Sequence, residues 1–131
     1  MIRVNFQTES HFPVKTKIIK EAVKSYLKKK VNRTAEVNVS IIGNRLMKNL
    51  NRKYRKIDST TTVLSFSQIE KSDNDNEVFV SSPDRILRLG DVVVSFPEAV
   101  RLARETNKMV DETVIELVFH GIDHLMGIHH D

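Results

Sequence analysis

Residues 110–131, VDETVIELVFHGIDHLMGIHHD, close the chain and hold four of its five histidines. From Val110 to Leu125 the apolar side chains recur at helical spacing, which predicts an amphipathic helix packed on a core. His120 and His124 are four residues apart, so their imidazoles stand one above the other at the edge of the apolar stripe. We expect this helix to hold both histidines beside a cleft.

Gly127 ends the predicted helix, because glycine readily adopts the left-handed conformation that a helix end requires. The chain that turns back there can bring His130 to the same place, which gives the spacing His-x-x-x-His-x-x-x-x-x-His. A histidine pair alone is more often a surface feature, but the glycine and the third histidine favour a metal site. Three imidazoles suit zinc with one open position. We therefore expect one Zn²⁺ ion on His120, His124 and His130.

The same histidine spacing occurs in the metzincin proteases, where a glutamate follows the first histidine and serves as the general base. This chain has Gly121 at that position. A glycine cannot accept a proton, so a metalloprotease-like hydrolase is an alternative function only.

The rest of the chain predicts one α+β domain over residues 1–131, with a small mixed sheet packed against helices. Expected strands cover residues 2–6, 36–42, 62–66 and 89–94, and expected helices cover about 13–30, 44–54 and 96–106. An exposed turn at residues 72–76 and a short edge strand at residues 77–80 are expected in the polar stretch between them. On the second helix we expect four side chains to face inward: Leu46, Met47, Leu50 and Tyr54.

Positive charge is concentrated in one part of the chain. Residues 15–56 hold 14 basic and two acidic residues, whereas the whole chain has a net charge of +4. Such a cluster attracts a phosphate backbone through counterion release, although most lysine stripes are only solvated helix faces. No aromatic-rich motif indicates a base-stacking platform. The candidate RNA-binding residues are Lys17, Lys20 and Lys24 on the first helix and Arg52 and Lys53 on the second.

Four segments resemble the YbeY family of metal-dependent endoribonucleases. Residues 120–130, HGIDHLMGIHH, are similar to the family's His-Gly-x-Leu-His-Leu-x-Gly-Tyr-Asp-His signature. Three further segments match the family in the same order: LNRKYR at 50–55, TTVLSFS at 61–67 and LGDVVVS at 89–95. The resemblance implies RNA cleavage and places the family's functional arginine at Arg55. Without the resemblance, Arg55 would be read as a helix-end or surface cation.

The departures from the signature bear on the site. His129 stands where the family has an aspartate, so two adjacent imidazoles compete for the third position, and we expect His130 to bind. Asp123 replaces a leucine. It could share a solvated face with Glu112 and Glu116, or accept a hydrogen bond from His120 and orient it, or serve as a general base.

The chain has no cysteine, which removes disulfides and thiolate ligands and is consistent with a reducing compartment. The start of the chain reads as a strand instead of a signal peptide, and no apolar run reaches membrane-spanning length. We expect a cytoplasmic protein with no membrane partner.

Three functions stay open: a single-strand endoribonuclease that matures small-subunit ribosomal RNA and acts in ribosome quality control, a metalloprotease, and an RNA- or ribosome-binding module with a structural metal. The ribonuclease ranks first. Bound zinc would lower the pKa of a coordinated water to about 7. Either that water or the ribose 2′-hydroxyl could be the nucleophile, and a guanidinium such as that of Arg55 could hold two phosphate oxygens.

Overall fold

The computed structural model describes residues 1–68, 70–71, 78–79 and 85–127 and contains an α+β domain. Its main sheet has four strands in the order β1-β2-β6-β3, where β3 is antiparallel and the others are parallel. The strands are β1 (Ile2–Thr8), β2 (Ala35–Ile42), β3 (Val63–Ser67) and β6 (Leu87–Ser95). The expected mixed sheet is confirmed.

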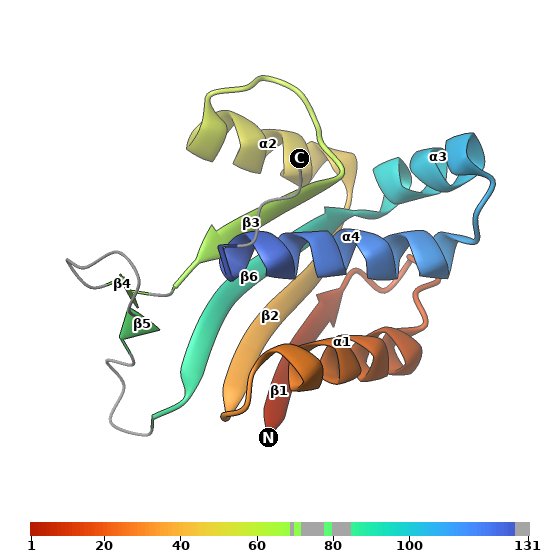
Figure 1. Cartoon of the computed structure of the whole chain (residues 1–131). Helices are drawn as coiled ribbons and strands as arrows, with labels where there is room; N and C mark the ends of the chain where they lie inside the picture. Colours follow the sequence, from red (N-terminus) through yellow and green to blue (C-terminus); the bar gives the residue numbers. More distant parts are fainter. Residues whose placement is uncertain (69, 72–77, 80–84, 128–131) are drawn as a thin grey trace.

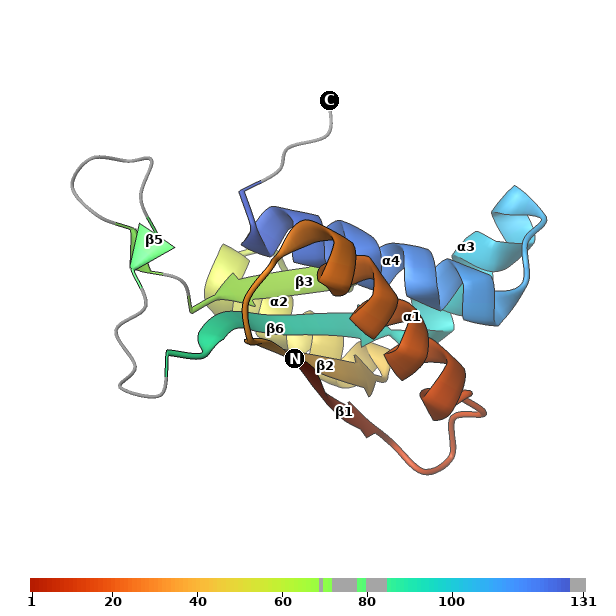
Figure 2. The same cartoon turned by 60° about the horizontal axis from the view of Figure 1, so that its bottom comes forward.

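Four helices pack on this sheet (Figure 1). They are α1 (Thr16–Lys30), α2 (Asn44–Arg55), α3 (Phe96–Thr106) and α4 (Val110–Leu125). Helices α1 and α4 lie side by side on one face, and α2 lies on the other (Figure 2). In the strand order β1-β2-β6-β3, the two edge strands are β1, which contacts α1, and β3, which contacts α4.

The larger core lies between the sheet and the pair α1 and α4, and it holds buried residues such as Ile19, Val39, Val92 and Val118. A smaller core under α2 consists of Ile42, Met47, Leu64 and Val93. Neighbouring residues of a strand point to opposite faces, which is why Val92 and Val93 belong to different cores. Burial on both faces explains the continuous apolar run at residues 92–94 of β6, whereas β2 alternates between buried and half-buried residues along most of its length.

Two expectations for the helices are wrong. Helix α1 begins at Thr16 instead of Pro13, because tight turns occupy the preceding residues: Val14 N–H donates to Phe12 O and Thr16 N–H donates to Val14 O. Leu46 and Tyr54 do not face inward but are 47% and 55% exposed. The buried face of α2 is narrow because this helix covers only part of the sheet.

The polar stretch contains a second, two-stranded sheet of β4 (Glu70–Lys71) and β5 (Val78–Phe79). Strand β5 agrees with the short strand expected at residues 77–80. The turn expected at residues 72–76 lies outside the described residues.

Candidate functional site

A pocket of about 700 Å³ lies between α4 and β3. Helix α4 runs along the β3 edge of the sheet, and α2 ends near the same place on the far side of β3 (Figure 1). The pocket wall includes Thr62 and Ser65 from the β3 side, His120 and His124 from α4, and Arg55 from α2. Arg55, His120 and His124, which the sequence analysis singled out in two separate segments, thus line one pocket.

The two histidines of α4 are arranged as the sequence predicts. Both side chains are exposed, both line the pocket, and their ring centroids are 4.4 Å apart with the rings tilted by 55°. Rings on successive helical turns at this separation can direct nitrogen atoms toward one ion. This half of the proposed metal site fits zinc.

The third ligand falls on a part of the chain that the structure does not describe. His130 and its neighbour His129 lie outside the described residues, and within residues 1–68, 70–71, 78–79 and 85–127 no three His, Asp or Glu side chains gather around a common point. The assignment of His130, and with it of Zn²⁺, stays a prediction.

Glu116 lies one helical turn before His120 and also lines the pocket. The Lys108 ammonium is 3.0 Å from both oxygens of this carboxylate. The ion pair offsets part of the negative charge of Glu116, although both side chains are about half exposed to solvent. The electrostatic repulsion between Glu116 and a phosphate group in the pocket is therefore weaker than it would be without Lys108.

Arg55 is the last residue of α2, and the following Lys56 adopts the left-handed conformation that ends the helix. Within the part of the chain that the structure describes, the exposed Arg55 guanidinium makes no hydrogen bond or ion pair. Its five N–H donors are available to a ligand in the pocket. The interpretation of Arg55 as a helix cap is not supported.

The five candidate RNA-binding residues do not form one surface. Arg52 and Lys53 are exposed on α2, one turn or less from Arg55, and Arg52 Nη1 lies 3.7 Å from Asp58. Lys17 and Lys24 are exposed and Lys20 is half-buried on α1, on the opposite face of the sheet (Figure 2). Lys24 lines a different hollow of about 880 Å³. The structure separates the two basic helices that the sequence groups together.

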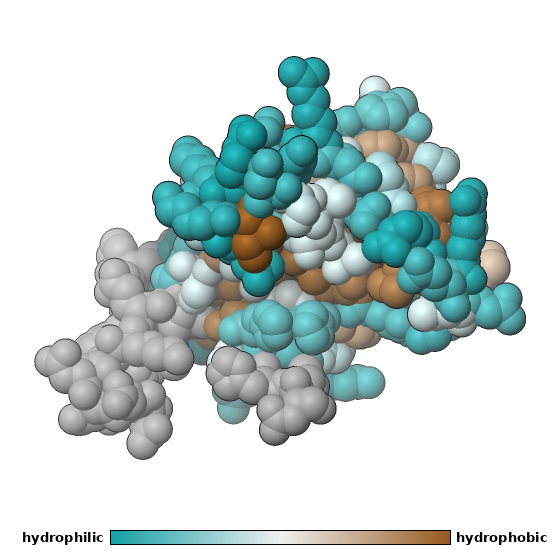
Figure 3. Space-filling model, turned by 90° about the horizontal axis from the view of Figure 1, so that it is seen from above, coloured by the Kyte–Doolittle hydropathy of each residue, from teal (hydrophilic) through white to brown (hydrophobic). Residues whose placement is uncertain are grey.

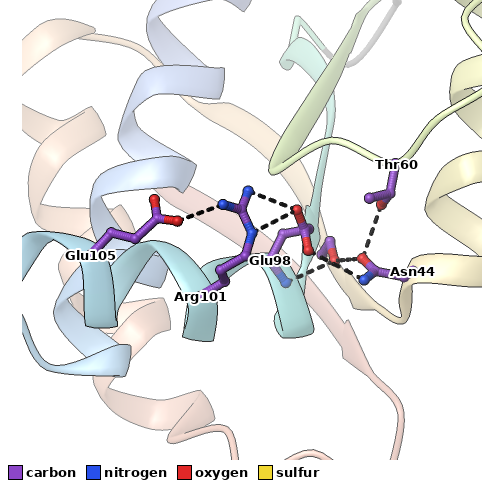
Figure 4. Close-up of polar contacts among 6 residues, drawn as sticks. Asn44, Thr60, Glu98, Arg101 and Glu105 are labelled. Atoms are coloured by element: carbon purple, nitrogen blue, oxygen red, sulfur yellow. Dashed lines mark hydrogen bonds and ion pairs between the residues drawn. The ribbon is translucent and has the colours of Figure 1, made fainter.

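A polar network, which the sequence did not predict, fixes the loop that enters β3 (Figure 4). Asn44 Oδ1 accepts hydrogen bonds from Thr60 Oγ1 at 2.9 Å and from Ser95 Oγ at 2.5 Å, and Asn44 Nδ2 donates to Glu98. Arg101 donates to Glu98 and to Glu105 and holds the pKa of Glu98 below its ordinary value. Ser95 also caps α3, because its side-chain oxygen accepts a hydrogen bond from Glu98 N–H. The network holds Thr60 next to pocket residues Thr61 and Thr62.

Asn51 fastens the same loop from below. It is 2% exposed, and its Nδ2 donates to the Ser59 carbonyl at 2.9 Å, while Ile57 N–H donates to the Asn51 carbonyl. The bond to Ser59 satisfies the amide nitrogen of the side chain, whereas its buried Oδ1 accepts no hydrogen bond among the described residues, which costs stability. The sequence feature that could have predicted this contact is Asn51 itself, a polar residue on the otherwise apolar face of the second helix.

Asp123 points away from solvent. It is 4% exposed, its Oδ1 accepts a 2.6 Å hydrogen bond from Tyr26 of α1, and the Lys30 ammonium is 3.8 Å away. Burial, followed by this hydrogen bond, raises the pKa of Tyr26 to about 12. The solvated-face expectation is wrong, and Asp123 does not line the pocket, as a general base would. Its role in orienting His120 stays a prediction: Asp123→Leu should lower metal affinity roughly tenfold to a hundredfold.

Gly121 allows α4 to approach the sheet closely. A Cβ atom at this position would lie 2.6 Å from Val92 Cγ1 and 3.1 Å from Val92 Cγ2. Val92 is a buried residue with a stiff branched side chain, so it cannot move aside easily. A larger residue at the position that holds the catalytic glutamate in metzincins would therefore require α4 or Val92 to shift.

Comparison with known proteins agrees with this arrangement. The model of the family described as "Endoribonuclease YbeY" matches residues 3–131. The chain belongs to the YbeY family. An endoribonuclease YbeY from Dehalococcoides mccartyi is 32% identical over 121 residues, which cover 89% of this chain and 70% of the relative. One from Caldicellulosiruptor saccharolyticus is 33% identical over 116 residues, which cover 88% and 73%.

The fold agrees with a solved structure as well. The solution structure of TM1509 from Thermotoga maritima superimposes with a TM-score of 0.62 at 27% identity, over 100% of this chain and 75% of that protein. The arrangement of helices and sheet is thus shared with a solved protein over the whole length of this chain. Among the residues that the structure describes, no helix is both long and apolar enough to cross a membrane.

Proposed function

We propose that this YbeY family member is a metal-dependent endoribonuclease that cuts single-stranded RNA in the pocket between α4 and β3. The observation that carries the proposal is that Arg55 and the histidine pair of α4, which are 65 residues apart or more in the sequence, line the same pocket. A cation that can grip a phosphate beside imidazoles that can hold a metal is the combination that phosphodiester cleavage requires.

We assign the metal to His120, His124 and His130, and zinc as the ion. The ring separation of 4.4 Å between His120 and His124 supports two ligands on one ion, and a neutral imidazole set favours zinc over magnesium. Bound zinc would supply a coordinated water with a pKa near 7 and would polarise a phosphate oxygen.

The chain's own side chains have separate tasks in this proposal. Arg55 donates two parallel hydrogen bonds to the phosphate oxygens on which negative charge develops. Ser65 and Thr62 offer hydroxyl groups to the ribose and phosphate on the opposite wall. Lys108 offsets part of the charge of Glu116, which lowers the repulsion between this carboxylate and the substrate. The nucleophile, water or the 2′-hydroxyl, stays open.

As the biological substrate we propose the precursor of small-subunit ribosomal RNA, with a part in ribosome quality control, as the family resemblance implies. Such work takes place on or near the ribosome in the cytoplasm, which is where we propose that the protein acts. Arg52 and Lys53, next to Arg55, would bind the strand that leads into the pocket.

The protease alternative is disfavoured by Gly121, because a glutamate side chain there would require α4 or Val92 to shift. The second alternative, an RNA-binding module with a structural metal, predicts that removal of the metal unfolds the protein. Our proposal predicts the opposite, since α4 is held by the core through Val114, Val118 and Ile122 and not by the histidines.

The test is elemental analysis of the purified protein together with cleavage of an unstructured RNA strand before and after chelation. We expect bound zinc, cleavage that stops on chelation and returns with metal, and an unchanged circular dichroism spectrum. His124→Ala should abolish cleavage, whereas His11→Ala, an exposed histidine outside the pocket, should not. RNA cleavage that persists in the metal-free protein would overturn the proposal.

A further inference from the structure

Tyr54 is exposed near the end of α2. It precedes pocket residue Arg55 on α2, and 55% of its surface is accessible. The other tyrosine, Tyr26, is packed against Phe119 with ring centroids 4.0 Å apart. Among the Tyr and Phe residues whose burial the structure describes, Tyr54 is the one that is exposed. This ring is therefore accessible to a ligand from solvent.

The position of the Tyr54 ring is fixed from one side. It makes an edge contact with Phe66 of β3, with ring centroids 5.0 Å apart and an angle of 62° between the planes. Phe66 is itself half-buried against the small core under α2. The ring is therefore held by a rigid strand and is not a loose surface side chain. A pre-positioned ring loses little conformational freedom when a ligand stacks on it.

The surroundings of Tyr54 are cationic. Arg52, Lys53, Arg55 and Lys56 all lie within two residues of it, and the Lys53 ammonium is 5.2 Å from the ring centroid. Figure 3 shows the molecule from above, where hydrophilic side chains predominate on the side that carries α2. A flat apolar surface inside a ring of positive charge suits a ligand that has planar bases on an anionic backbone.

We propose that Tyr54 stacks on an unpaired RNA base next to the phosphate that Arg55 binds. The proposal rests on the RNA-cleaving function given above and narrows the substrate to a strand with an unpaired base at the cleavage site. The Lys53 ammonium gives up its place over the ring and pairs with a neighbouring phosphate. The exchange is favourable, because base stacking on an aromatic ring is stronger than an exposed cation–π contact.

The stacking surface also explains how a protein without an aromatic-rich strand motif could prefer single strands. Bases in a duplex are stacked on one another and cannot reach the ring, whereas a single strand can turn one base outward. Every base has an aromatic face, so stacking selects unpaired bases with little regard to sequence.

The test compares binding of two fluorescently labelled strands in chelator, where no cleavage occurs: a twelve-residue oligoadenylate and an abasic ribose-phosphate strand of the same length. Tyr54→Leu should weaken oligoadenylate binding roughly fivefold to a hundredfold and leave binding of the abasic strand unchanged. Tyr54→Phe should bind both strands like wild type, and so should the matched control Leu46→Ala, which removes an exposed apolar side chain at the other end of α2.

Equal weakening on both strands, no weakening on either, or a wild type that does not distinguish the strands would overturn the stacking proposal. Thermal unfolding of each variant separates loss of fold from loss of stacking. A second measurement uses the wild type alone: a strand that contains 4-thiouridine should cross-link to Tyr54 under ultraviolet light, and cross-links confined to other residues would contradict the proposal. Metal-dependent cleavage without any effect of Tyr54→Leu would reject stacking alone, whereas base-dependent binding without cleavage would reject the nuclease function alone.

Discussion

The two long sides of α4 differ in solvent exposure and in packing. One side faces the pocket and carries His120 and His124, which are exposed. The other side faces α1, where Phe119 stacks on Tyr26 and the Asp123 carboxylate is buried under Tyr26 and Lys30. One helix thus has a solvent-exposed side that lines the pocket and a tightly packed side that fixes the position of the helix. Replacements on the two sides should therefore affect different measurements.

The largest effect is expected on the open side. His124→Ala should lower RNA cleavage by more than roughly a hundredfold, because it removes a metal ligand. The unfolding midpoint of the metal-free protein should change little, since the side chain is exposed. Cleavage assays and urea unfolding in chelator give the two numbers. If metal-free His124→Ala lost as much stability as a core replacement does, the contrast between the exposed and the packed side of α4 would be wrong.

The next effect concerns the packing of α4 on the sheet. Gly121→Ala should destabilise the protein by about 1–3 kcal/mol, because the new methyl group would lie 2.6 Å from Val92 Cγ1. Val92→Ala provides the matched test, since it removes the atoms that clash. The double variant should be more stable than the sum of the two single changes predicts. Simple additivity in urea unfolding would show that position 121 does not press on Val92.

A smaller effect is expected where α4 meets α1. Tyr26→Phe should cost about 1 kcal/mol, because Asp123 loses a hydrogen-bond donor while Lys30 stays nearby. The raised pKa of Tyr26 means that its contribution is complete below pH 10, the ordinary value, and is lost as the pH rises toward about 12. The stability difference between wild type and variant should therefore shrink over this range. A difference that does not change with pH would contradict the hydrogen bond.

The smallest effect is expected from the basic helices, which lie on opposite faces of the sheet. Replacing Arg52 and Lys53 by glutamine should lower the salt dependence of RNA binding by a slope of about 0.7 for each phosphate that the protein no longer binds. The same replacement of Lys17, Lys20 and Lys24 should change it less, because α1 does not border the pocket. A larger change in the salt dependence from the α1 lysines would show that RNA binds on the face of the sheet that α1 covers.

The order of strands and helices was predictable from the sequence because it depends on local patterns. The apolar patterns around Val39 and Val92 and the capping serine at position 95 each act over a few residues. The histidine pair was predictable for the same reason, since residues four apart on a helix share a face. The pairing of Arg55 with these histidines came from the family resemblance, and the structure confirms that they line one pocket.

The errors arise where tertiary contacts decide the outcome. A helical wheel places Asp123 on the polar side of α4. The wheel takes no account of neighbouring helices, and α1 places Tyr26 against that side. Tyr54 continues the apolar stripe of α2, yet it is exposed because the helix ends there beside Phe66. The excess of positive charge in residues 15–56 suggested a single basic surface. In the structure the sheet lies between α1 and α2, so these charges are on two separate faces (Figure 2).

The claim that the open side of α4 holds the metal is tested most directly by zinc titration of single alanine variants. Wild type and His129→Ala should each bind one zinc ion per chain, whereas His120→Ala, His124→Ala and His130→Ala should each lose that affinity. Loss of zinc in His129→Ala with retention in His130→Ala would show that the third ligand is wrong. Wild-type affinity in both His120→Ala and His124→Ala would contradict a metal site on α4 altogether.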